Sequence, residues 1–360
     1  MQKWANKSQK NSKMKEIDPI GQGFWAGLQR PFYCLAPMAN VTDSVFRKLF
    51  AKYGKPDVTW TEFVSADGLN SKGKKRLLKD LEYTNKERPI VAQLFTGHPL
   101  EMYKACKLVA ELGFDGIDIN MGCPDKAVEK QGGGASLIKN PNLALEIIEC
   151  ARKGVLDAYK KRGNKKFPKK VIPISVKTRL GYNKIDLDWI RILLEQKLPA
   201  LTVHLRTRKE MSLVDAHWDL MNEIVRLRDV ISPSTKIIGN GDVISKKDGE
   251  KKIAKSGCDG VMVGRGVFGK PWFFGDPEDV QHPGATDIEF RLGVMVEHAK
   301  AFEKAFKNIK SFDIMKKHFK AYVSGWDGAK ELRIELMGAK SAFEVGRVVG
   351  RYLSVIREIN

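Results

Sequence analysis

The strongest constraint on the fold is an alternation of short apolar runs with longer amphipathic stretches along the first 280 residues. The short runs are rich in β-branched residues, which favour strands, and the stretches between them carry apolar residues at helical spacing. Near-continuous apolar strands separated by helices are typical of a parallel sheet that is covered on both faces. The expected strands are 32–38, 58–63, 89–95, 114–120, 171–178, 200–205, 236–241 and 260–264, and the expected helices are 43–53, 99–112, 141–159, 187–197, 218–229 and 246–256.

Eight such strands in about 230 residues predict a (β/α)8 TIM barrel rather than an open doubly wound sheet. An open sheet would more often carry GxGxxG after its first strand, and CLAPMANVTD (34–43) does not. The connection after the second strand shows no clear element. Beyond a linker rich in proline and glycine (269–287), the sequence is helical. We therefore predict a basic N-terminal tail (1–30), a catalytic barrel (31–283) and a small helical domain (284–360).

The chain is strongly basic, with 63 lysines and arginines against 43 aspartates and glutamates and a formal net charge of +20. The excess is clustered in the N-terminal tail, in SKGKKRLLKD (71–80) and in KKRGNKKFPKK (160–170). Such clusters favour a polyanionic partner, and we expect nucleic acid. The alternative is a surface that serves solubility alone.

Other features of the composition narrow the class of protein. No apolar run is long enough to predict a membrane span, and the polar N-terminus lacks the apolar segment of a secretory signal. The five cysteines are scattered without a CxxC pair, so we expect neither disulfides nor a metal site. The expected location is the cytoplasm, and the expected oligomeric state is a monomer.

The carboxyl ends of the strands in such a barrel, with the loops after them, form the active-site face. Residues suited to binding or chemistry follow nearly every expected strand, which a barrel used only as a scaffold would not require. They are Pro37, Met38 and Ala39 after the first strand, Gln93 on the third, Asn120 and Cys123 at the fourth, Lys177 and Arg179 on the fifth, His204 on the sixth with Arg206 and Arg208 after it, Asn240, Gly241 and Asp242 at the seventh, and Gly264 and Arg265 at the eighth.

The last two strand ends predict a phosphate site. GNGD (239–242) and GRG (264–266) supply glycine amides that can approach an anion, and the corresponding loops of barrels commonly bind phosphate. Arg265 adds charge-assisted hydrogen bonds, and His204 can add a donor. A lone NGD is more often a plain turn, but its pairing with GRG favours a phosphorylated cofactor or substrate.

Lys177 and Gln93 are expected to project from strands on the same face. A lysine at a buried strand end is costly unless it meets an anion, and Gln93 can both donate to and accept from a flavin or a pyrimidine. A lysine near N1 of a flavin would stabilise the anionic reduced ring. The alternative is a lysine that reaches out to solvent.

Cys123 follows the fourth strand in NMGCP (120–124), where glycine and proline impose an unusual turn. An ordinary thiol, with a pKa of about 8.5, is protonated at neutral pH and can act as a general acid. A nucleophilic role would require a base or cation that lowers the pKa, and no partner histidine is evident. The other four cysteines are expected to be structural. The glycines of QGGGASL (131–137) are expected to form a flexible loop that can close over a bulky substrate.

The chain resembles the tRNA-dihydrouridine synthases in seven stretches that follow that family's order and spacing from about residue 31 to 275. These are APMANVTDSVFR, VAQLFTGHP, DGIDINMGCPDKAVEKQGGGASLIKNP, VKTRLGY, VHLRTR, GNGDVIS and GVMVGRGVFGKPWFF. The C-terminal MKKHFKAYVSGWDGAKELRIELMGAKS is similar to the family's helical tRNA-binding domain. The specific element is NMGCP followed by GGGASL.

The resemblance implies a flavin enzyme that uses FMN and NADPH to reduce a uridine of tRNA to 5,6-dihydrouridine. Hydride from FMN N5 would reach C6 of the uracil, and Cys123 would protonate C5 from the other side. Asn120 and Arg179 would contact the uracil. By the same resemblance, FMN would be held by Pro37, Met38, Ala39, Gln93, Lys177, His204, Asn240, Gly241, Asp242, Gly264 and Arg265.

The chain departs from the family pattern at Asn40, where the family often has glycine, and in its basic segments. We expect the N-terminal tail and the 160–170 insert to add nonspecific affinity for RNA. Two other functions stay open. An FMN-dependent reductase of a free pyrimidine, similar to the dihydroorotate dehydrogenases, would share the phosphate site but would not explain the charge or the helical domain. A non-catalytic RNA-binding barrel would not require Cys123 or Lys177.

Overall fold

A closed barrel of parallel strands forms the larger part of this computed structural model, which describes residues 21–160, 171–275 and 287–359. Each strand pairs in parallel with the next one in the sequence, and β8 pairs with β1. The predicted (β/α)8 TIM barrel is therefore confirmed, as are all eight strands. They are β1 (Phe32–Leu35), β2 (Val58–Ser65), β3 (Ile90–Phe95), β4 (Gly116–Met121), β5 (Ile174–Arg179), β6 (Ala200–His204), β7 (Lys236–Asn240) and β8 (Gly260–Val263).

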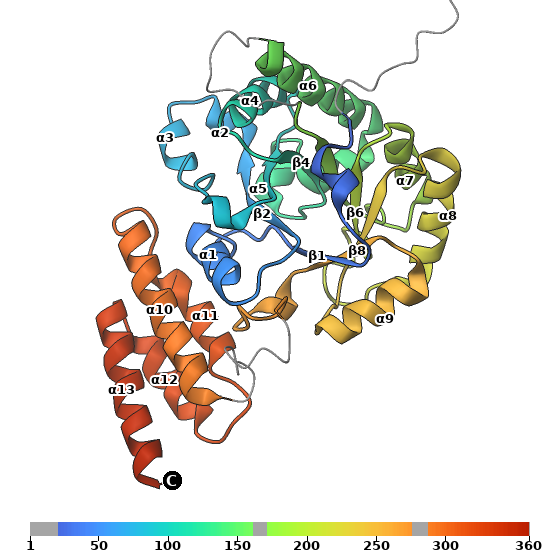
Figure 1. Cartoon of the computed structure of the whole chain (residues 1–360). Coiled ribbons are helices and arrows are strands. Elements are labelled where there is room, and N and C mark those ends of the chain that lie inside the picture. The colour runs from blue at the N-terminus through green and yellow to red at the C-terminus, as the bar shows by residue number, and fades with distance from the viewer. Residues whose placement is uncertain (1–20, 161–170, 276–286, 360) are drawn as a thin grey trace, which may run out of the picture.

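The six helices that the sequence predicts lie around the outside of the barrel (Figure 1). Proline accounts for two strand boundaries that differ from the prediction. β1 ends ahead of Pro37 and β5 begins only after Pro173, because proline has no N–H to donate to a ladder. The helices are α1 (Ser44–Tyr53), α4 (Pro99–Glu111), α6 (Pro141–Lys160), α7 (Leu187–Glu195), α8 (Met221–Ile231) and α9 (Lys246–Ser256).

The connection after β2 contains two short helices, α2 (Ala66–Leu69) and α3 (Lys74–Leu77), and a 3₁₀ turn, η2 (Asn85–Glu87). It is anchored to α1 by Arg47, whose Nε lies 2.7 Å from Glu87 Oε2 with both side chains fully buried. Arg47 also donates to the carbonyl oxygen of Thr42 at 2.7 Å. Each charge of this buried ion pair needs the other, because loss of either partner would leave an unpaired buried charge.

The amino-terminal ends of the strands are closed by a 3₁₀ turn, η1 (Gly23–Gly27). The Trp25 side chain is 1% exposed, and its ring centroid lies 6.3 Å from that of Phe32 and 5.8 Å from that of Trp60. Trp25 is therefore packed against the barrel and is not part of a tail, although the tail was expected to span 1–30. The basic segments 1–20 and 161–170 lie outside the described residues.

Four helices after the barrel pack into a second unit beside α1 (Figure 1). Their apolar faces form a cluster of their own, to which α1 adds Val45, Leu49 and Tyr53. The helical C-terminal segment is thus present, while its expected boundary at 283/284 falls outside the described residues. The four helices are α10 (Ile288–Phe306), α11 (Met315–Tyr322), α12 (Ala329–Gly338) and α13 (Ala342–Ile359).

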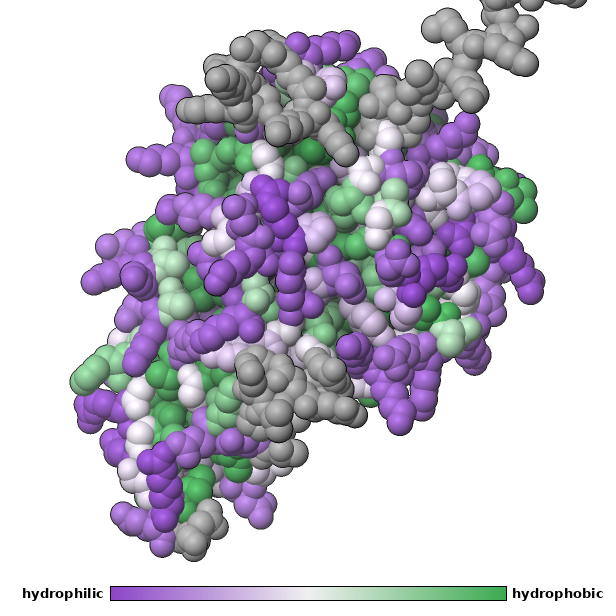
Figure 2. Space-filling view, viewed as in Figure 1, coloured by the Kyte–Doolittle hydropathy of each residue, from purple (hydrophilic) through white to green (hydrophobic). Residues whose placement is uncertain are grey.

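Hydrophilic residues cover most of the face that Figure 2 shows, over both the barrel and the C-terminal helices. Within the described ranges, no helix is long and apolar enough to cross a membrane.

Two buried histidines lie where the C-terminal helices meet the barrel. The ring centroids of His298 (α10) and His318 (α11) are 4.7 Å apart, and the Phe46 ring of α1 lies 5.7 Å from the first and 5.2 Å from the second. Burial lowers the pKa of His298 to about 3 and that of His318 well below its ordinary value. Both imidazoles are therefore neutral at pH 7.

Because both imidazoles are buried and neutral, we expect acid to weaken the contact between the two units. A histidine whose pKa is lower in the folded than in the unfolded state contributes stability above the unfolded pKa of about 6.5, and that stability is lost as the pH falls below it. Between pH 7.5 and pH 5, the unfolding free energy of the wild type should fall by about 2 kcal/mol more than that of the variant His298→Leu. Urea unfolding at both pH values measures this loss.

Phe302→Leu is the matched control, because Phe302 is buried on the same helix and does not titrate. It should lower stability equally at both pH values. An identical pH dependence in wild type and His298→Leu would contradict the prediction.

Candidate active site

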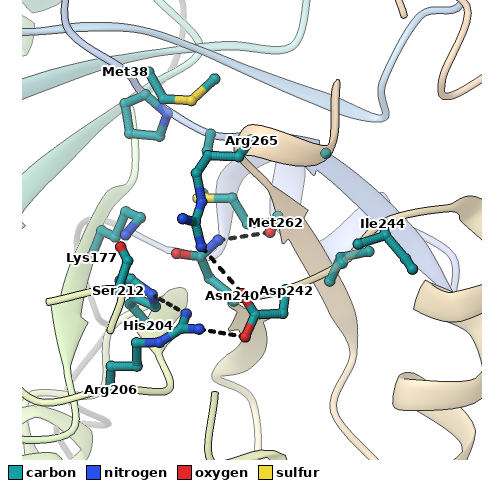
Figure 3. Close-up of a pocket in the computed structure, with 16 residues that line it drawn as sticks. Met38, Lys177, His204, Arg206, Ser212, Asn240, Asp242, Ile244, Met262 and Arg265 are labelled. Atoms are coloured by element: carbon teal, nitrogen blue, oxygen red, sulfur yellow. Dashed lines mark hydrogen bonds and ion pairs between the residues drawn. The ribbon is translucent and has the colours of Figure 1, made fainter. Parts of the chain in front are cut away.

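A cavity of about 450 Å³ opens at the carboxyl ends of the strands (Figure 3). Ala39 and Gln93 do not border it, but the other residues predicted to hold a flavin do: Pro37, Met38, Lys177, His204, Asn240, Gly241, Asp242, Gly264 and Arg265. The wall is completed by Ala36, Arg206, Ser212, Val243, Ile244, Met262 and Gly266.

Strand register explains why residues distant in the sequence meet at this cavity. Asn120 of β4 is level with Lys177 of β5, Arg179 is level with His204 of β6, and His204 is level with Asn240 of β7. Because side chains alternate along a strand, Lys177 and Arg179 lie on the same face of β5. The parallel register thus brings these groups to one end of the barrel.

Asp242 organises the cationic side of the cavity. Its Oδ2 accepts hydrogen bonds from Arg206 and from the N–H of Ala216, the latter at 2.9 Å, and its Oδ1 lies 3.3 Å from Arg265 Nη2 (Figure 3). Burial would raise the pKa of Asp242, but the Ala216 N–H and the Arg206 guanidinium outweigh it, so the pKa lies below its ordinary value. The carboxylate therefore stays ionised and holds both arginines in place.

His204 and Lys177 present two different kinds of donor. Arg206 Nη1 lies 3.2 Å from His204 Nε2, and because the guanidinium can only donate, Nε2 accepts and Nδ1 carries the proton. Burial, followed by the charges of Lys177 and Arg179, lowers the pKa of His204 well below its ordinary value, so the ring is neutral. Burial likewise lowers the pKa of Lys177 to about 8. Lys177 makes no hydrogen bond or ion pair with the residues that the structure describes.

The turn that carries Cys123 is shaped by the Asn120 side chain. Asn120 Oδ1 accepts the N–H of Gly122 at 3.1 Å and that of Cys123 at 2.9 Å. The thiol is half-buried, and burial raises its pKa, while the charges of Lys177 and Arg179 act in the opposite direction. Cys123 therefore keeps its proton at neutral pH.

The glycines after Cys123 allow close packing of the backbone, a role that the sequence did not indicate. Gly134 has a φ of +60°, and a Cβ there would lie 2.7 Å from the Cys123 carbonyl oxygen. A Cβ at Gly133 would lie 3.1 Å from the backbone of Thr96. The Ala135 N–H donates to the Cys123 carbonyl oxygen at 2.9 Å. The backbone can approach the thiol only because side chains are missing here.

Arg179 connects this turn to the loop after β6. Its Nε donates to the Gly122 carbonyl oxygen at 2.8 Å, and its Nη1 donates to those of Thr207 and Met211 at 3.0 Å and 3.1 Å. Arg179 is 6% exposed, and burial lowers its pKa to about 10. Asn120 and Arg179, expected from the resemblance to contact a uracil, thus also hold the Cys123 turn in shape.

The departure at Asn40 has a conformational explanation. Asn40 has a φ of +53°, in the left-handed region that glycine adopts freely and asparagine tolerates. Its N–H donates to Glu62 Oε1 at 2.5 Å, and Glu62 Oε2 accepts from Lys310 of the C-terminal unit at 2.8 Å. The substitution therefore keeps the turn after β1.

The sequence placed Arg206 after the sixth strand but gave it no role in binding, and it did not point to Ser212. Arg206 follows His204 by two residues, so the alternation of side chains in an extended segment is a signal that could have placed it beside the histidine. Ser212 belongs to a loop whose path depends on bonds such as that from Arg179 to Met211, and nothing in its local sequence indicates its position.

The raised pKa of Cys123 predicts slow thiol alkylation at neutral pH. In a Cys150→Ser background, which removes the other partly exposed cysteine, the iodoacetamide rate should rise with pH through a midpoint above about 8.5, the value of a free thiol. Peptide mass spectrometry identifies the alkylated residue. A midpoint clearly below that of a free thiol would instead indicate a thiolate nucleophile.

Similarity to known proteins extends over both units of the fold. A family model described as dihydrouridine synthase matches residues 34–354. A probable tRNA-dihydrouridine synthase of Staphylococcus aureus strain COL is 40% identical over 335 residues, which are 92% of this chain and 96% of the relative. The probable tRNA-dihydrouridine synthase 2 of Bacillus subtilis strain 168 is 40% identical over 330 residues, 90% of this chain and 94% of the relative. The chain therefore belongs to the dihydrouridine synthase family.

Proposed function

We propose that this protein is a tRNA-dihydrouridine synthase, which reduces a uridine of tRNA to 5,6-dihydrouridine with FMN as cofactor and NADPH as reductant. The relatives named above carry the same activity in their names and align over nearly their whole length. The observation that carries the proposal is the protonated, half-buried thiol of Cys123, which is held in a shaped turn and on which the charge of Lys177, a residue of the cationic cavity, acts.

The cavity has the chemistry that FMN requires. Arg265 and Arg206, tied together through Asp242, concentrate positive charge beside the backbone of Gly241 and Gly264, which suits a phosphate. Met38 and Met262 add apolar surface for a ring system. A volume of about 450 Å³ lies within the range of sites for molecules of this size.

Lys177 and His204 would bind the polar edge of the ring. An anion beside Lys177 offsets the cost of burying its charge, and the Nδ1–H of His204 offers a neutral donor. FMN, when bound, supplies the hydride for C6 of the uracil and is reduced in turn by NADPH. Gln93 is fully buried and does not line the cavity. One of its two side-chain N–H groups donates to Asp118, so only the other would be free to donate to the cofactor.

Cys123 would supply the proton that completes the reduction. The C5–C6 double bond of uracil becomes single when C6 gains hydride and C5 gains the proton from Sγ, and the thiolate recovers a proton from water. A raised thiol pKa keeps Cys123 in the acid form at neutral pH. Arg179 and the remaining N–H of Asn120 would orient the uracil against this thiol.

The substrate is expected to be a uridine within folded tRNA. Such a base must leave its stack to enter a site at the mouth of a barrel, and the net charge of +20 favours binding of the surrounding phosphates. We assign the tRNA-binding role to the C-terminal helices together with the barrel, and we expect a cytoplasmic monomer that requires no metal.

The proposal predicts a yellow protein that modifies tRNA. Purified protein with NADPH and unmodified tRNA should give a mass gain of two hydrogen atoms on a uridine, detected by mass spectrometry of nuclease digests. Cys123→Ala should retain FMN, seen in the absorption spectrum, and lose about a hundredfold or more in rate because it lacks the acid. Cys150→Ser is the matched control and should keep the wild-type rate.

Different failures of this experiment have different meanings. A yellow protein that reduces free uracil or orotate but no tRNA would instead support a free-pyrimidine reductase. A colourless protein that binds tRNA and cannot be reconstituted with FMN would support a non-catalytic RNA-binding barrel.

A further inference from the structure

A chain of buried polar side chains leads from the barrel interior to the Cys123 turn. Ser175 Oγ donates to Asp118 Oδ1 at 2.6 Å, and Gln93 Nε2 donates to Asp118 Oδ2 at 2.7 Å. Asn120 Nδ2 donates to Gln93 Oε1 at 3.0 Å, and Asn120 Oδ1 accepts the Cys123 N–H at 2.9 Å. Asp118 and Gln93 are fully buried, and Asn120 is 6% exposed.

The two ends of this chain impose the same direction on the amides between them. An ionised carboxylate can only accept hydrogen bonds, and a backbone N–H can only donate them. Gln93 must therefore turn its nitrogen to Asp118 and its oxygen to Asn120, which in turn directs its own nitrogen to Gln93 and its oxygen to the turn. A flip of either amide would bring two donors or two acceptors together.

Asp118 is ionised under the conditions in which this order matters. Burial raises its pKa to about 6, against the effects of the hydrogen bonds from Gln93 and Ser175 and of the Lys177 charge. At pH 7.5 most of the protein therefore carries an acceptor-only group at this position.

We propose that Asp118 is a positioning residue for Cys123, because its carboxylate orients Gln93 and, through Gln93, the Asn120 amide that shapes the turn carrying the thiol. The inference rests on the proposed function in one respect only, which is the catalytic role of the thiol. Asp118 does not line the cavity, and among the described residues no hydrogen bond joins it to Cys123.

The position of the thiol depends on the orientation of Asn120. With its oxygen toward the turn, Asn120 satisfies the N–H groups of both Gly122 and Cys123. If the Asn120 nitrogen faced the turn instead, both hydrogen bonds would be lost, and its NH2 group would face the two backbone N–H groups. In a buried site, the turn could remove this conflict between donors only by moving. A small displacement of an acid relative to its substrate lowers the rate steeply.

A different role for Asp118 would be that of a counter-charge for Lys177 alone, and two uncharged variants separate the two roles. Asp118→Asn removes the charge, but its oxygen can still accept from Gln93 while its nitrogen donates to Ser175. Asp118→Leu removes both the charge and the acceptor. The order of the chain therefore survives in the first variant and is lost in the second.

The first measurement is the iodoacetamide rate at Cys123 at pH 7.5, in the Cys150→Ser background and without added flavin. Asp118→Leu should change this rate by about fivefold or more, and Asp118→Asn should stay within about twofold of the parent. With tRNA and NADPH, Asp118→Leu should lower kcat by about tenfold or more with little change in KM for tRNA. Ser175→Ala, which leaves the bond between Asp118 and Gln93 intact, is the control and should behave as the parent.

Gln93→Leu provides an independent break if Asp118→Leu does not fold. It keeps the carboxylate and removes the link to Asn120, so it should change the thiol rate by a similar factor. An unchanged thiol rate in the chain-breaking variants would overturn the proposal. The proposal would also be overturned if Asp118→Asn changed the thiol rate as much as Asp118→Leu does, because charge alone would then explain the effect. The thiol rate needs no turnover, so absence of dihydrouridine formation by the parent would count against the proposed function alone.

Discussion

Closure of the sheet between β1 and β8 is the constraint on which the rest of this structure depends. The two strands pair from Phe32 with Gly260 to Leu35 with Val263. A Cβ at Gly260 would lie 2.5 Å from the Phe32 carbonyl oxygen, so only glycine allows this approach. Because the ring closes with all strands parallel, every carboxyl end faces the same way, and Trp25 fills the other end. One face is thereby left for binding and chemistry.

The barrel interior holds a buried polar pair beside an apolar cluster, and the pair supports the site. The cluster contains Trp25 and Trp60 as well as Met262 of the cavity wall. Asp118 and Gln93 form the polar pair, fully buried and joined to each other at 2.7 Å. Polar groups at this depth are stable only when each is hydrogen-bonded, so they form an ordered support beneath the cavity.

The C-terminal helices reach the site through the turn after β1. Lys310 Nζ lies 2.8 Å from both Glu62 and Asp80, and Glu62 accepts the N–H of Asn40 next to the cavity residues Pro37 and Met38. The C-terminal unit is therefore joined to the turn beside the cavity through Glu62 as well as by the chain.

The alternation of apolar strands with amphipathic helices was enough to predict the barrel, because each strand is buried on both sides and each helix on one. The same pattern placed His204, Asn240 and Arg265 at strand ends, and hence at one face, since parallel strands bring their carboxyl ends together. The sequence predicted a flexible loop at QGGGASL, but it did not show that Gly134 is packed against Cys123.

Partners beyond the local sequence decided the rest. The sequence singled out Gln93 but not Asp118, and only the register of β3 and β4 shows that the two lie side by side. The orientation of Asn120 follows from that pair, and so does the turn that carries Cys123. The sequence by itself determined the fold class and the end of the barrel at which chemistry occurs, because burial and periodicity are local properties. Only the tertiary structure determined how the thiol is held, because hydrogen-bond direction depends on partners from other strands.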